Sequence, residues 1–118
     1  MEREMRSLLA EIGFMAGGHG YHEEAEKICD GLEADDPEDG KPVIIRALSR
    51  MNQGQAEAAA RLLEQALAAG KTERPLLQAF LGMAYHLAGR SGDKHRILEQ
   101  LVDAAEDPQA VEMARAFL

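Results

Sequence analysis

The sequence has no tryptophan, only two tyrosines and three phenylalanines, and a single cysteine. With so few aromatic residues, small and aliphatic side chains must form the core, as they do where helices approach closely. Cys29 alone cannot form an intrachain disulfide, so nothing indicates reliance on an oxidising compartment. The chain is 118 residues long and 46% hydrophobic, which is enough for one domain with a core.

An excess of basic residues and a long apolar run are also missing. Thirteen Lys and Arg face 21 Asp and Glu, and the net charge of −8 repels phosphates, so we expect no nucleic-acid partner. The most apolar stretch, 75–88, is interrupted by Gln78 and His86 and is too short to cross a bilayer. The charged N-terminus lacks the apolar run of a secretory signal. These features predict a soluble, cytoplasmic protein with no membrane partner.

Residues 42–67 predict two antiparallel helices joined at residues 52–54. The second helix carries one apolar stripe, formed by Ala59, Leu63, Ala66 and Leu67. The first helix is apolar on almost every side, so more than one neighbour must cover it. We therefore expect further helical hairpins on both sides of this one.

Helical periodicity and turn residues divide the rest of the chain in the same way. A first helix over 2–16 is expected to turn a set of large apolar residues inward: Met5, Leu8, Leu9, Ile12 and Met15. Further helices are predicted over 21–34, 75–88, 93–106 and 108–118, separated by Gly-rich or Pro-containing turns. The last of them is expected to cover the end of the structure.

An internal period supports a repeat architecture. Ala25 and Ala59 are 34 residues apart, and Gly20, Gly54 and Gly89 are spaced by 34 and 35. Over nearly its whole length the chain resembles the tetratricopeptide-repeat family, on the signature positions Leu9, Ile12, Gly13, Ala25, Pro37, Leu81, Gly82 and Tyr85. It departs from the pattern at Arg46-Ala47, Arg50 and Lys94.

This resemblance implies an all-α fold in one domain, residues 1–118. Three tetratricopeptide-like helical hairpins, at about 6–39, 40–73 and 75–106, would stack as a short right-handed superhelix. A C-terminal capping helix over 108–118 would follow.

In such stacks the first helix of each hairpin lines the concave side. The family's geometry then gives a candidate groove for a partner helix, lined by Phe14, Ile44, Leu48, Met51, Leu76, Ala79, Met83 and Leu87. Nearby positions on the same side are Ser7, Ala10 and Lys41. An apolar groove suits the non-polar stripe of a helix, and an empty one would favour self-association. Alternatively, these residues pack only against the chain's own helices.

Two segments, Gly18–Ala25 and Leu48–Gly54, are similar to the hairpin turns of type III secretion needle chaperones (YscG/PscG type). The resemblance implies a cytoplasmic chaperone whose concave face holds the C-terminal amphipathic helix of a needle subunit and prevents premature polymerisation. It also implies a small helical co-chaperone, docked at the N-terminal end of the repeats.

Two other interpretations stay open. In the first, the chain is a scaffold or adaptor that binds other proteins reversibly. In the second, it is a metal-dependent or redox protein that uses His19, His22 and Cys29. The mixed spacing of those three residues is a weak metal signal, and turn and core roles explain them better. No carboxylate pair or nucleophile–base pair stands out, so we expect no catalytic residue, no metal and no cofactor.

Overall fold

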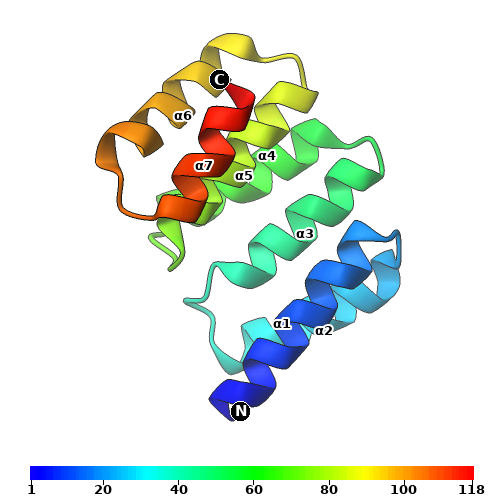
Figure 1. Cartoon of the computed structure of the whole chain (residues 1–118). Helices are drawn as coiled ribbons and strands as arrows, with labels where there is room; N and C mark the ends of the chain where they lie inside the picture. Colours follow the sequence, from blue (N-terminus) through cyan, green and yellow to red (C-terminus); the bar gives the residue numbers. More distant parts are fainter.

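The computed structural model describes residues 1–118 as seven α-helices without a strand (Figure 1). The helices are α1 (Arg3–Gly18), α2 (His22–Asp35), α3 (Lys41–Asn52), α4 (Ala56–Ala68), α5 (Arg74–Leu87), α6 (Ser91–Ala104) and α7 (Pro108–Phe117). The predicted all-α class is confirmed, and the predicted helices lie within about two residues of the observed ones. None of the helices combines the length and apolar character that a bilayer crossing requires.

Successive helices pair along the chain, α1 with α2, α3 with α4 and α5 with α6. Each new pair also packs on the one before it, because α3 contacts both α1 and α2, and α5 contacts both α3 and α4. The C-terminal helix α7 packs on α5 and α6 (Figure 1). One end of this series is therefore covered by α7, whereas α1 lies at the other end.

Helix α3 is the centre of the core, as its apolar sequence requires. Ile44 belongs to a cluster with Leu63 of α4 and Leu77 of α5. The neighbouring Ile45 belongs to a second cluster, with Cys29 and Leu32 of α2. Consecutive side chains of one helix thus serve two parts of the core, which confirms that α3 needs cover from more than one direction.

Helix α1 packs on this core through its smallest residues. Its buried positions are Ala10, Gly13, Ala16 and Gly17. A Cβ atom on Gly13 would lie 2.9 Å from Cδ1 of Ile45 and 3.1 Å from Cγ2 of Ile28, so the helices approach to a distance that a larger residue would prevent.

The expected orientation of α1 is wrong for four of five residues. Met5, Leu8, Ile12 and Met15 are exposed, and only Leu9 packs against the core. The physical reason is that α1 has two apolar faces, and the face with small residues makes the closer contact with α2 and α3.

A charged network joins α2 to α3. Arg46 pairs with Glu26, Asp30 and Glu33, and Arg50 pairs with Glu26 at 2.8 Å. Burial opposes ionisation of Glu26, but hydrogen bonds from the two arginines outweigh it and hold the pKa of this carboxyl below its usual range. Arg46 thus satisfies its charge at a position where the repeat pattern has leucine.

Gly82 of α5 tests how closely the helices are packed. A Cβ atom there would lie 2.6 Å from Cγ of the fully buried Leu98 on α6. We expect Gly82→Ala to lower the free energy of unfolding by about 1–3 kcal/mol, because Leu98 must move. Urea unfolding followed by circular dichroism measures this change.

Gly31 is the matched control, since it lies inside α2 with no atom within 4 Å of the added Cβ. Gly31→Ala should raise the free energy of unfolding by about 0.5–1 kcal/mol through helix propensity. Equal effects of the two substitutions would contradict the close packing of α5 on α6.

Candidate functional site

Three of the eight predicted groove residues are part of the core. Ile44 and Met51 belong to the central cluster around α3, α4 and α5. Ala79 is buried among Leu98 of α6 and Ala114 of α7. These three residues pack against the chain's own helices and do not line an open surface. The prediction that they line a groove is therefore wrong, and the alternative of packing within the chain holds for them.

The other five residues retain some exposure. Phe14, Leu48, Leu76 and Met83 are half-buried, and Leu87 is 57% exposed. We call these five residues the inner wall. Phe14, Leu76 and Met83 also pack at the margin of the central cluster, so they have both a structural contact and a free side.

The inner wall crosses three neighbouring helices. Phe14, Leu48 and Met83 recur at intervals of 34 and 35 residues on α1, α3 and α5. Helix α3 packs against both α1 and α5, so the three helices that carry these positions are adjacent. None of the three surface hollows includes an inner-wall residue. The inner wall is therefore shallow, and it offers contact area rather than a closed pocket.

A second apolar surface, on α1, was assigned to the interior by sequence. Met5, Leu8, Ile12 and Met15 follow at intervals of three and four residues and are 43% to 63% exposed. We call these four residues the α1 stripe. It continues into a hollow of about 320 Å³ lined by Ile12, Met15, Ala16, His19, Tyr21 and Glu24. Helix α1 also has a face of small residues, which includes Gly13 and Gly17. This face is the signal in the sequence that could have predicted that the α1 stripe is exposed.

The α1 stripe lies at the end of the structure that has no covering helix. Helix α1 packs only on α2 and α3, whereas α7 covers α5 and α6 at the opposite end (Figure 1). Four large apolar side chains in one row form a larger exposed patch than scattered surface hydrophobics do. The stripe is therefore a candidate surface for contact with another protein.

The histidines and the cysteine do not form a common site. Sγ of Cys29 is buried and donates a hydrogen bond to the carbonyl oxygen of Pro42 at 3.3 Å. Burial raises the pKa of this thiol to about 12. Nδ1 of His22 lies 2.6 Å from Oγ of Ser49, and His19 is exposed after α1. Nowhere do three or more His, Cys, Asp or Glu side chains gather as metal ligands.

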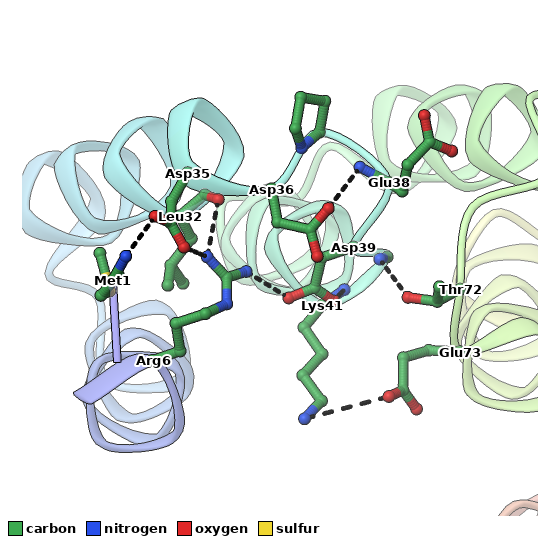
Figure 2. A network of polar contacts seen from close by, with 12 residues as sticks. Met1, Arg6, Leu32, Asp35, Asp36, Glu38, Asp39, Lys41, Thr72 and Glu73 are labelled. Carbon is green, nitrogen blue, oxygen red and sulfur yellow. Dashed lines mark hydrogen bonds and ion pairs between the residues drawn. The ribbon is translucent and has the colours of Figure 1, made fainter. Parts of the chain in front are cut away.

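A polar network joins the beginning of α1 to the turns that precede α3 and α5 (Figure 2). Arg6 donates hydrogen bonds to Asp35 and Asp39, both at 2.6 Å, and to the carbonyl oxygen of Leu32 at 3.1 Å. Across the next turn, the backbone N–H of Gly40 donates to Oγ1 of Thr72 at 3.2 Å. These contacts fix the N-terminal ends of α1, α3 and α5 relative to one another.

The chain matches a known protein family over nearly its whole length. Residues 1–117 match a family model described as "Bacterial type III secretion system chaperone protein". The match includes all but the last residue and confirms the resemblance drawn from the two turn segments. A search of curated proteins finds no match.

The burial of Cys29 predicts an unreactive thiol. In the native chain we expect labelling by a thiol-specific disulfide reagent at pH 8 to be roughly a hundredfold slower than in the denatured chain, because the thiolate is scarce and inaccessible. The absorbance of the released thiol group measures the rate. Fast, stoichiometric labelling of the folded chain would contradict the core role and would revive a redox function.

Proposed function

Because the chain belongs to the family of bacterial type III secretion system chaperones, we propose that it holds the C-terminal amphipathic helix of a needle subunit in the cytoplasm and prevents its premature polymerisation. The observation that carries the proposal is the inner wall, where Phe14, Leu48 and Met83 keep a free apolar side at one repeated position of three adjoining helices. A needle subunit must bury its helix to polymerise, so covering that helix blocks assembly without any reaction. The proposed role is accordingly non-enzymatic.

The finer architecture is part of the proposal. Units 6–39, 40–73 and 75–106 would be tetratricopeptide-like hairpins of one domain, stacked as a right-handed superhelix, and residues 108–118 would be their cap. Support comes from the packing of α3 on both α1 and α2, and of α5 on both α3 and α4. In such a stack the first helices, which carry the inner wall, line the concave side.

The energetics limit what the inner wall can do alone. Full burial of a large apolar side chain contributes about 1.5–3 kcal/mol, and the inner-wall residues except Leu87 are already half-buried. The five residues together therefore contribute roughly 5 kcal/mol, which is near the lower end of the association cost of about 4–15 kcal/mol. A stable complex needs further contacts beyond the inner wall.

For the α1 stripe we propose a different occupant, a small helical co-chaperone. Its exposed row at intervals of three and four residues matches the seam that a second helix requires. The contact would cover the uncapped end of the stack, as α7 covers the other end. Without that partner, a second copy of the chain could occupy the stripe, although the net charge of −8 opposes this.

The inner wall is tested by introducing charge at its centre. We expect Leu48→Asp and Met83→Asp to weaken binding of the needle subunit encoded in the same genome by roughly thirtyfold or more, because an unpaired carboxylate would be buried under the client helix. Co-expression followed by gel filtration, and calorimetry on the purified proteins, measure the loss.

Leu62→Asp is the matched control, since Leu62 is a half-buried leucine on α4 and outside the inner wall. It should leave client binding unchanged, and circular dichroism should show equal helical content in all three variants. Unchanged binding by Leu48→Asp and Met83→Asp, or reversible micromolar binding to a free monomer, would favour the scaffold or adaptor alternative.

The α1 stripe is tested with Ile12→Gln combined with Met15→Gln. Both side chains are exposed, so we expect stability to change by no more than about 0.5 kcal/mol per substitution while co-chaperone binding is lost and client binding persists. Calorimetry with the co-chaperone of the same secretion system measures this.

Leu118→Gln is the control, because Leu118 is an exposed residue of similar size at the opposite end of the chain. Light scattering on the unliganded chain shows whether a second copy of the chain, rather than a co-chaperone, occupies the α1 stripe. A dimer that the stripe substitutions dissociate, with co-chaperone binding unaffected, would assign the α1 stripe to self-association.

A further inference from the structure

The acidic excess of the chain lies in its first two helices and the turn that follows them. Residues 1–39 carry twelve of the 21 acidic residues but only three of the 13 basic ones, Arg3, Arg6 and Lys27. They account for the whole of the net charge of −8, so the remaining residues together are close to neutral. Because α1 lies at the end of the structure that α7 does not cover, the negative charge gathers at that uncovered end (Figure 1).

Only some of these carboxylates are compensated within the chain. Five of them pair with Arg6 or Arg46. By contrast, Glu4, Glu11 and Glu24 are exposed, and their carboxylates make no ion pair or hydrogen bond within the chain. These three negative charges are therefore free to act on a partner.

The three free carboxylates lie beside the α1 stripe. Glu4 and Glu11 are within four residues of Leu8, which places both along one edge of the stripe. Glu24 belongs to α2 and lines the hollow into which the stripe continues. An exposed apolar row with charged edges is the arrangement by which paired helices choose their partners.

No lysine or arginine of the chain compensates this edge. Arg6 faces α2, where it pairs with Asp35. Arg3 lines a different hollow, together with Lys41 of α3. Lys27 lies on α2 but is not among the residues of the hollow beside the stripe. The compensating charge must therefore come from whatever covers the stripe.

We propose that the α1 stripe binds a helix whose apolar row is flanked by lysine or arginine, and that Glu4, Glu11 and Glu24 select this helix. The inference rests on the proposed function, in which another protein occupies the stripe, and it adds the chemistry of that protein. Apolar contacts supply area but accept any amphipathic helix, whereas unpaired carboxylates at the edge reject an acidic one. The negative charge of residues 1–39 would also accelerate the encounter with a basic helix.

A second copy of the chain is a poor match for this surface. In a symmetric dimer the same surface of both copies is in contact, so two acidic segments 1–39 would face each other. Neither copy has a lysine or arginine in the hollow beside the stripe to offset the repulsion. Charge complementarity therefore favours a basic helix of another protein over self-association.

The experiment uses helical peptides of known charge, so that it does not depend on a natural partner. Three synthetic peptides share one leucine row and carry lysine, glutamine or glutamate at the flanking positions. Each is titrated into ¹⁵N-labelled full-length chain at low salt. We expect saturable shifts of the Leu8, Ile12 and Met15 amide signals with the lysine peptide, about tenfold weaker binding of the glutamine peptide, and no binding of the glutamate peptide.

Substitutions then identify the selecting carboxylates. Glu4→Gln with Glu11→Gln and Glu24→Gln should weaken binding of the lysine peptide by about tenfold, because the charges that face its lysines are removed. The same variant should reduce the salt dependence of binding, since less of the remaining attraction is electrostatic. All three side chains are exposed, so circular dichroism should show unchanged helical content.

Two further variants locate the effect. Glu99→Gln with Asp103→Asn and Glu112→Gln removes the same charge from exposed residues of α6 and α7, which also have no ion pair. It should change binding of the lysine peptide by less than about twofold, because these charges are far from the stripe and are screened. Ile12→Gln with Met15→Gln should abolish binding of the lysine and glutamine peptides alike.

Equal binding of the lysine and glutamine peptides, or equal weakening by the two triple variants, would overturn the charge preference. The co-chaperone of the same secretion system separates this inference from the proposed function. If it binds the native chain and the variant at Glu4, Glu11 and Glu24 equally at low salt, the inference fails while docking on the stripe holds. If the lysine peptide binds as expected but the co-chaperone does not bind, the proposed docking fails while the charge preference holds.

Discussion

The close approach of α1 to α3 is the constraint on which the surface of this chain depends. Gly13 and Gly17 allow the backbone of α1 to contact Ile45, and a Cβ atom on Gly17 would lie 3.3 Å from the Ile45 carbonyl oxygen. A helix has room for only one such face toward a given neighbour. Once the small residues occupy the contact, Leu9 and Phe14 are the only large residues of α1 that still pack on the core, and the residues of the α1 stripe stay exposed. The α1 stripe is exposed because the small residues of α1 make the contact with α3. Its exposure does not mean that the chain has too few hydrophobic residues.

The same constraint explains why α3 tolerates Arg46 at its centre. Apolar residues of α3 fill the contacts with α1, α4 and α5, and Ile45 also packs on the apolar residues of α2, whereas Arg46 faces the acidic residues of α2. Burial would lower the pKa of Arg46, but the hydrogen bond to Glu26 and the nearby negative charges, including Glu26 and Asp30, together outweigh it, and the net pKa is raised. Because Glu26 also accepts from Arg50, removing this carboxylate would leave Arg50 without an ion-pair partner and Arg46 with only Asp30 and Glu33. The network fixes how α2 lies on α3 more than it adds stability.

Much of the fold was predictable from sequence, because helix ends depend on local chemistry. Glycines at positive φ, such as Gly54 and Gly89, end helices, and Asp107 accepts hydrogen bonds from the first turn of α7. The orientation of α1 was not predictable from periodicity, since Met5, Leu8 and Ile12 have the period of a core face. The burial of Ile44 likewise depends on how closely α4 approaches α3, and the burial of Ala79 on how closely α7 approaches α5. These distances cannot be predicted from a single sequence.

Apolar surface in this chain is therefore divided among three uses. Buried apolar residues from all seven helices form the core, the inner-wall residues are only partly buried, and the residues of the α1 stripe are exposed. A half-buried residue such as Phe14 or Met83 cannot be exchanged for a polar one without a cost to the fold, so selection for stability preserves the inner wall even without a client. The α1 stripe has no such structural role, and its four large side chains cost solubility. An apolar row that stability does not require is therefore an indication of a partner surface that is independent of the inner wall, on which the proposed client binding rests.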